Sequence, residues 1–388
     1  MANIVDYINW RGDLSFKVCP FNEIDALILT QLAMIDFEGI VSAFPDTEEI
    51  KLREAADKYF LLDGEEKKTL GLIIPGDIIP MFKSMSVNKR YSDMRLCAYV
   101  NHVSTDTEKQ FAALTVKTGD GSFVIFRGTD DTLVGWKEDL NLSFLEAIPS
   151  QKEAVEYLDC IGRSVRGVIR VGGHSKGGNL SVYAAVKCRD SVRKKIKEVY
   201  NFDGPGFSKD FLSLQEYQSL DGRIRTIVPQ SSIVGMLFEN DSKYSVVKST
   251  ESGLLQHNAL SWETEREGLV RLPELTEESR RITKEINALI SDLDNDARRS
   301  FADAVYGVMI STNATTLTEL YKDKMTVLRS MSKTDKETRR LVIKILGLIM
   351  KDGGGQMLSV ILNSMFKGQH EIPKTDKKSI DTKSKKNG

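Results

Sequence analysis

The segment Gly173-His174-Ser175-Lys176-Gly177 has the residue types and the spacing of a reactive serine on a tight turn. It fits the pattern G-x-S-x-G, which places a serine on a sharp, strained turn between a strand and a helix. An apolar, β-branched run precedes it and small residues follow it, as this motif requires. We therefore predict that Ser175 is a nucleophile and that the amide of Lys176 faces a developing oxyanion.

Two other interpretations fit this segment less well. A phosphate-binding loop needs the spacing G-x-x-x-x-G-K-[ST], but Lys176 follows the serine instead of preceding it. A tight turn whose serine has no chemical role is the simpler alternative, and the strand and helix on either side make it the weaker one.

A nucleophilic serine needs a base, and the chain has only four histidines. His174 lies inside the turn, so its side chain should point into the fold, while His102 precedes the nucleophile and His370 lies near the end of the chain. His257 alone follows both the nucleophile and the last predicted strand, which satisfies the order nucleophile, acid, histidine. We predict that His257 is the base.

The acid that orients this base should lie between the serine and the histidine, in a loop at the strand ends. Asp203 ends the strand after the nucleophile strand, at the edge of the sheet where ligands bind. Glu239 and Asp241 come later and remain alternatives. We favour Asp203, although an aspartate before Gly-Pro is also a common turn former.

A second oxyanion donor should come from the loop after an earlier strand. The run Phe126-Arg127-Gly128-Thr129 ends such a strand, so we predict Thr129 as this donor. Arg127 and Asp139 could form an ion pair that holds the loop, although they could equally be surface charges.

Short apolar runs predict the strands that position these residues, at 96–103, 111–117, 122–126, 168–171, 199–202, 223–228 and 244–247. The first two should form a hairpin. Helices are predicted at 179–188 and after a capping-box pattern, Ser150 with Glu153. The alternation of strands and helices predicts an α/β fold with a mostly parallel central sheet and helices on both faces.

The chain divides by pattern into four parts. Residues 1–75 are predicted to form an N-terminal helical extension, 76–268 the α/β core, and 269–370 a C-terminal helical region. Residues 371–388 form a lysine-rich tail that is expected to be disordered.

Composition excludes several classes of function. Lys+Arg (54) and Asp+Glu (55) give a formal net charge of -1, which does not call for nucleic acid. The four cysteines have no CxxC spacing, and we expect neither a zinc site nor a cofactor. No apolar run is long enough to span a membrane, and we expect a cytoplasmic protein.

Three motifs together resemble a known family: FRGT (126–129), the later W-x-x-D-L (136–140) and the GHSKGG elbow. They are similar to the class 3 (fungal-type) lipases. The version GHSKGGNL, with FDGPGF and QHN, is more similar to an uncharacterised bacterial lipase-like branch. The resemblance covers residues 90–265. It implies an α/β-hydrolase fold, ester hydrolysis and a contribution of Thr129 to the oxyanion hole.

The chain departs from the class 3 pattern at two places. Lys176 stands where those lipases usually carry leucine, and the stretch VPQSSIVGML (228–237) has no acid where they place theirs. Pancreatic-type lipases place the acid one strand after the nucleophile, and Asp203 resembles that arrangement.

These observations predict a serine hydrolase that cleaves a carboxylic ester, either a small molecule or a lipid, through Ser175, His257 and Asp203. A thioesterase or a phospholipid acyl hydrolase would use the same residues. A non-catalytic interaction protein of the same fold is the alternative from another class. The C-terminal helices could form the contact of a homodimer.

Overall fold

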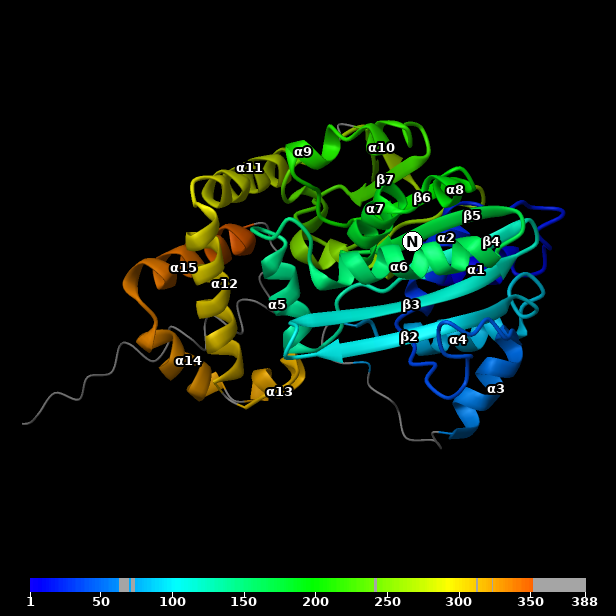
Figure 1. Cartoon of the computed structure of the whole chain (residues 1–388), viewed down its shortest axis with the longest axis horizontal. Helices are drawn as coiled ribbons and strands as arrows, with labels where there is room; N and C mark the ends of the chain where they lie inside the picture. Colours follow the sequence, from blue (N-terminus) through cyan, green and yellow to red (C-terminus); the bar gives the residue numbers. More distant parts are fainter. Residues whose placement is uncertain (63–69, 71–73, 241–242, 312, 323, 352–388) are drawn as a thin grey trace, which may run out of the picture.

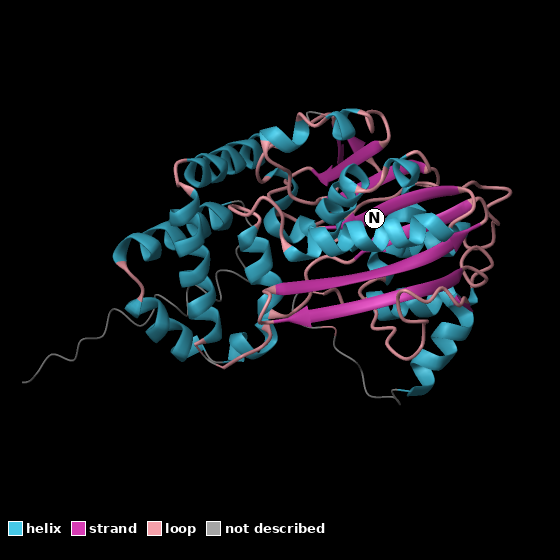
Figure 2. Ribbon diagram, viewed as in Figure 1, coloured by secondary structure: helices cyan, strands magenta, loops and turns pink. Residues whose placement is uncertain are grey.

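The computed structural model describes residues 1–62, 70, 74–240, 243–311, 313–322 and 324–351. A single sheet runs through the molecule, with helices packed on both of its sides (Figures 1 and 2). Its strands are β1 (Ile50–Lys51), β2 (Arg95–Ser104), β3 (Lys109–Thr118), β4 (Gly121–Phe126), β5 (Val168–His174), β6 (Ile196–Phe202), β7 (Ile224–Pro229), β8 (Tyr244–Val247) and β9 (Arg271–Leu272).

The helices fall into an N-terminal, a central and a C-terminal group. The N-terminal group is α1 (Ile4–Arg11), α2 (Glu23–Leu32), α3 (Leu52–Leu62) and α4 (Ile78–Val87). The central group is α5 (Leu133–Asn141), α6 (Pro149–Ser164), α7 (Lys176–Lys187), α8 (Asp190–Arg193), α9 (Lys209–Leu212) and α10 (Gln215–Gln218), with short 3-10 turns at Val234–Met236, Gly253–His257 and Ala259–Ser261. The C-terminal group is α11 (Glu277–Ser291), α12 (Asn295–Ile310), α13 (Leu317–Lys322), α14 (Lys324–Lys333) and α15 (Lys336–Lys351).

The sheet is mixed, and its strands lie side by side in sequence order. Strands β4 to β8 are parallel to one another, while β1, β2 and β3 form an antiparallel run that joins β4, and β9 is antiparallel to β8. The carboxyl ends of β5, β6 and β7 therefore share one edge. Residues that directly follow these three strands can meet there.

Alternating side chains divide the core between the two faces of the sheet. On β4, Phe123 and Ile125 pack with α1, α2 and α4, whereas Val124 and Phe126 pack with α6 and α7. The N-terminal helices thus pack on one face of the sheet, and the central helices pack on the other. Their apolar side chains are part of the core instead of an appendage to it.

A buried ion pair joins α2 to the segment that follows α4. The Arg90 guanidinium donates to Asp25 on α2, with its Nε 2.7 Å from Oδ1, and both side chains are fully buried. The Tyr91 hydroxyl donates to the same Asp25 oxygen, and Arg90 lies over the ring of Phe16. Removing either charge would leave the other one buried without a partner, which is strongly destabilising.

The C-terminal helices pack against the central part through α5. Helix α12 runs beside α5 (Figure 1). Lys137 on α5 donates to Asp303 on α12 at 2.6 Å. Beyond α12, the backbone around Thr316 pairs with the loop that leads into α5: the Leu133 N–H donates to Thr315 O at 2.9 Å, and the Leu317 N–H to Asp131 O at 2.8 Å.

The α/β architecture and all seven predicted strands are confirmed. The sheet as a whole is not mostly parallel, because four of its neighbouring pairs are parallel and four are antiparallel. The predicted capping box is wrong: α6 begins at Pro149, and the Ile148 N–H donates to the side chain of Gln151. The predicted tail, 371–388, lies outside the described residues.

Candidate active site

Ser175 occupies a strained turn between β5 and α7. Its backbone angles are φ 59° and ψ -133°, a region that residues other than glycine seldom adopt. The Ser175 N–H donates to Phe202 O at the end of β6, 2.9 Å away, which helps to hold the turn. Strain of this kind persists only where the surroundings enforce it, and it is typical of a nucleophile elbow.

The two motif glycines are required by close approach of the backbone. A Cβ on Gly173 would lie 2.2 Å from the carbonyl carbon of Gly177, and one on Gly177 would lie 2.1 Å from Phe126 O. Helix α7 therefore starts in direct backbone contact with β5 and β4. Any larger residue at either position would push the helix away and displace Ser175.

Asp203 and His257 meet at the same edge of the sheet. Asp203 follows β6 with a positive φ of 52°, and its Oδ2 accepts a hydrogen bond from His257 Nδ1 at 2.6 Å. The other carboxylate oxygen accepts from the Ser232 hydroxyl at 2.5 Å. With Nδ1 as the donor, a neutral His257 has its Nε2 free to accept a proton.

The side chain of His174 holds the backbone of His257. Its Nε2–H donates to His257 O at 2.7 Å, since a carbonyl can only accept, and the two imidazole rings lie 4.6 Å apart. Burial, assisted by the nearby His257, lowers the pKa of His174 to about 3, so this ring stays neutral at physiological pH. The prediction that His174 points into the fold is confirmed, but sequence reasoning missed that it holds His257.

The structure thus brings Asp203 and His257 into contact and places Ser175 next to His174. Within the described residues, no hydrogen bond joins the Ser175 hydroxyl to the His257 ring. Such bonds are often long before substrate binds and tighten in the reacting complex. Of the alternative acids, Glu239 pairs with Lys209 at the surface, 3.5 Å away, and Asp241 lies outside the described residues.

The loop after β4 lies against the serine turn. A Cβ on Gly128 would lie 2.7 Å from His174 O and 3.2 Å from the Ser175 Cβ, so glycine lets this loop approach the nucleophile. Thr129 comes next, is buried, and donates its hydroxyl to Asp139 Oδ2 at 2.6 Å. Thr129 is therefore held close to the turn that carries Ser175.

The ion pair suggested between Arg127 and Asp139 is wrong. Arg127 pairs with Asp130 at 2.8 Å, three residues along the same loop, and Asp139 accepts from Thr129 instead. Burial raises the pKa of Asp139 to about 6, against the opposing charge of Lys176. Asp139 is thus a carboxylate that changes charge near neutral pH within reach of the proposed oxyanion loop.

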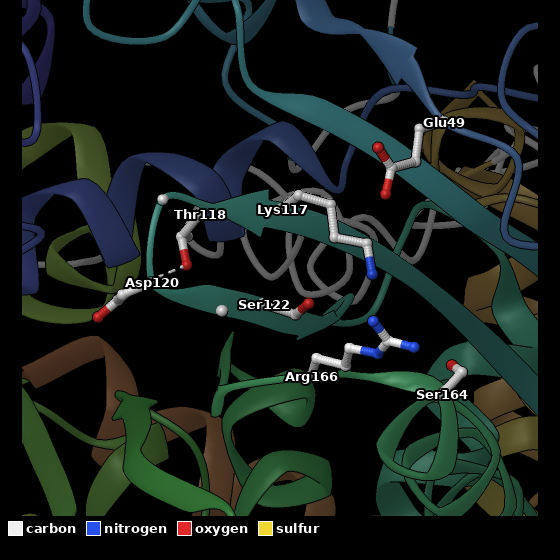
Figure 3. Close-up of a pocket in the computed structure, with 9 residues that line it drawn as sticks. Glu49, Lys117, Thr118, Asp120, Ser122, Ser164 and Arg166 are labelled. Carbon is white, nitrogen blue, oxygen red and sulfur yellow. Dashed lines mark hydrogen bonds between the residues drawn. The ribbon is translucent and has the colours of Figure 1, made fainter.

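A separate polar hollow of about 450 Å³ lies at the opposite edge of the sheet (Figure 3). It is bordered by Lys117 and Thr118 at the end of β3, Ser122 on β4, and Arg166 before β5. Ser175 follows the other end of β5, so the hollow in Figure 3 is not where the serine chemistry would occur.

Among the described residues, no group of three or more His, Cys, Asp or Glu side chains is arranged to hold a metal ion. In the same part of the chain, every helix is too short or too polar to cross a bilayer.

Fold and site together define an α/β protein with a serine on a strained turn and an aspartate–histidine pair beside it. A comparison with protein families assigns the chain more specifically: the Mbeg1-like family model matches residues 85–307. The chain belongs to the Mbeg1-like family.

A comparison with solved structures found several similar chains. The crystal structure of M37 lipase is similar to this chain at 15% sequence identity and a TM-score of 0.35, over 56% of this chain and 70% of that one. A comparison with curated proteins found no match.

Proposed function

We propose that this protein is a lipase-like serine hydrolase of the α/β-hydrolase type that cleaves a carboxylic ester. One observation carries the proposal: the Asp203–His257 pair lies beside a serine whose backbone is held in a strained elbow. Strained turns and buried charge pairs each occur for structural reasons, but their combination at one sheet edge is what acyl transfer requires.

The mechanism follows from the atoms that each residue presents. Ser175 Oγ attacks the ester carbonyl while His257 Nε2 takes its proton, and the imidazolium then protonates the leaving alcohol. Asp203 holds the ring through Nδ1 and stabilises its positive charge. A water molecule, activated by the same histidine, attacks the acyl-enzyme and releases the acid.

The oxyanion would be held by two backbone donors. The Lys176 N–H stands at the start of α7, where the helix dipole favours negative charge, and the Thr129 N–H belongs to the loop that approaches the elbow. Removing one such donor usually costs about 100- to 1,000-fold in rate. Cleavage of thioesters or phospholipid acyl groups needs the same machinery, and a substrate panel distinguishes these cases.

A fluorophosphonate probe tests the proposal directly, because it reacts with activated serines. Wild type should be labelled, and Ser175→Ala and His257→Ala should not. Ser164→Ala is the matched control, since this serine borders the hollow at the opposite sheet edge and should label like wild type. A folded wild type that resists the probe would contradict the proposal and favour a non-catalytic interaction protein.

A further inference from the structure

A buried lysine–glutamate pair joins the elbow to α5. Lys176 is the first residue of α7, and its side chain is only 1% exposed. Its ammonium donates to Glu138 Oε2 at 3.0 Å, to Gln110 O at 3.0 Å and to Gln110 Oε1 at 2.7 Å. All three donors of the lysine are used, so the side chain is fixed in one position.

Glu138 is equally constrained. Its side chain is fully buried, and it accepts from the Gln110 N–H on β3 at 3.1 Å and from the Ser150 N–H at the start of α6 at 2.9 Å. The carboxylate therefore sits at a helix N-terminus, which favours its charge. Helices α5, α6 and α7 and strand β3 all meet at this one ion pair.

The neighbouring carboxylate completes a connection between the two proposed oxyanion donors. Asp139 accepts from the Thr129 hydroxyl, and its free oxygen lies 4.0 Å from the Lys176 ammonium. Helix α5 thus contacts one donor residue through Asp139 and the other through Glu138. The distance between the Thr129 and Lys176 amides depends on how α5 is held against the elbow.

Packing alone does not account for a charged pair at this place. Two buried charges lose their hydration, and an apolar pair of similar volume is often as stable or more stable. What the ion pair supplies and an apolar side chain does not is a set of directional bonds. Direction matters most where two amides must point at one oxygen atom, because a displacement of about 1 Å can cost about 100-fold in rate.

We propose that the Lys176–Glu138 ion pair is a positioning pair that sets the geometry of the oxyanion hole. The lysine would serve twice: its amide binds the oxyanion, and its side chain, through Glu138, fixes α5 and with it Thr129. This inference rests on the proposed function and adds two side-chain roles to it.

Two variants separate positioning from folding. Lys176→Met keeps the amide but leaves Glu138 as an unpaired buried charge, so it should melt at a lower temperature. The double variant Lys176→Met/Glu138→Gln removes both charges and keeps similar volumes and one carbonyl acceptor, so it should melt at a higher temperature than Lys176→Met alone. In that double variant we expect kcat to fall about 10- to 100-fold with KM nearly unchanged.

A transition-state analogue supplies the readout that a purely structural role would not move. A trifluoromethyl ketone forms an oxyanion on the serine, so its affinity for the double variant should fall by the same factor as kcat/KM. Lys137→Met is the matched control, because it removes another buried lysine beside Glu138 whose partner, Asp303, lies on α12. Its kcat/KM should stay within about threefold of wild type.

The outcomes are distinct. A folded double variant that turns over ester and binds the ketone like wild type would overturn the positioning role and leave the proposed function standing. Equal losses in Lys137→Met would also overturn it, since the effect would then belong to α5 packing in general. A wild type without labelling or turnover would remove the proposed function, and the positioning role with it.

Discussion

Two histidine–carboxylate pairs occur in the described part of this chain, at nearly the same distance and in different surroundings. His257 Nδ1 lies 2.6 Å from Asp203 Oδ2, and the two side chains are 25% and 1% exposed. His102 Nδ1 lies 2.5 Å from Glu153 Oε1, with exposures of 57% and 19%. The bond length alone therefore does not distinguish a candidate catalytic pair from a surface ion pair.

The surroundings do distinguish them. Glu153 also accepts from Lys109 at 2.6 Å, so its charge is already compensated, and the pair borders an open hollow of about 500 Å³ beside α6. Among the described residues, the second oxygen of Asp203 accepts only a neutral hydroxyl, from Ser232, so no other cation compensates the carboxylate charge that faces His257. A buried carboxylate with one neutral and one imidazole partner can stabilise an imidazolium, which is what catalysis needs.

The largest expected difference in kcat/KM is between substitutions of the two histidines. His257→Ala should reduce kcat/KM for an ester by at least about 10,000-fold, because the serine loses its base. His102→Ala should change it by less than about twofold, since that ring is exposed and pairs with Glu153 instead of a proposed catalytic residue. Rates with a chromogenic ester and probe labelling measure both. Comparable losses in the two variants would refute the distinction.

Substitutions of the two carboxylates should differ almost as much in their effect on kcat. Asp203→Asn keeps the shape but no longer stabilises the imidazolium and favours the wrong tautomer, so kcat should fall about 1,000- to 10,000-fold. Glu153→Gln should be nearly neutral for kcat. If Asp203→Asn kept more than a tenth of wild-type kcat, another acid would have to orient His257, and Glu239 would be examined next.

A third comparison concerns how the free energy of unfolding depends on pH. The folded-state pKa of His174 is lowered to about 3 from the usual 6.5, so below pH 6.5 the unfolded chain binds a proton that the folded protein does not. The free energy of unfolding should therefore decrease as the pH falls, by about 2 to 3 kcal/mol at pH 4.5.

Thermal melting at pH 7.5 and pH 4.5 checks this, with His174→Gln compared with wild type. The acid-induced drop in melting temperature should be smaller in His174→Gln, because the titrating ring is gone. An unchanged drop in His174→Gln would mean that other groups set the acid sensitivity.

The smallest effect on kcat is expected at Ser232, whose hydroxyl donates to Asp203. Ser232→Ala removes the hydroxyl that donates to Oδ1, and kcat should fall about 3- to 10-fold, which corresponds to about 1 kcal/mol, the net contribution of a typical hydrogen bond. Ser231→Ala is the control, since its hydroxyl bonds to Thr276 instead. Steady-state kinetics measures kcat for both variants. Equal kcat values for Ser231→Ala and Ser232→Ala would show that the hydrogen bond from Ser232 to Asp203 is dispensable.

Much of the site's layout could be predicted because it depends on local patterns. The strand before Ser175 and the helix after it follow from residue types, and His257 follows by elimination among four histidines. The structure brings Asp203 to His257 because consecutive parallel strands end at the same edge. The roles assigned to these residues stay predictions until they are tested by activity.

The rest depends on contacts that no local pattern encodes. The hydroxyl of Ser232 reaches Asp203 only because β6 and β7 are neighbours, and His174 supports a residue 83 positions away. The partner of Arg127 was mistaken because Asp130 competes from the same loop. For the N-terminal helices, the sequence predicted a helical extension but not that its apolar side chains pack on one face of the sheet.

The backbone pairing at Thr316 bears on how modular this protein is. The family match ends at residue 307, yet Leu133 N and Asp131 O, a few residues after Thr129, take their partners from Thr315 and Leu317. A chain shortened to the matched region would leave both groups unpaired, at a cost comparable to lost hydrogen bonds. The C-terminal helices are therefore a poor place for a fusion junction, because truncations that remove them would also disturb the loop that follows Thr129.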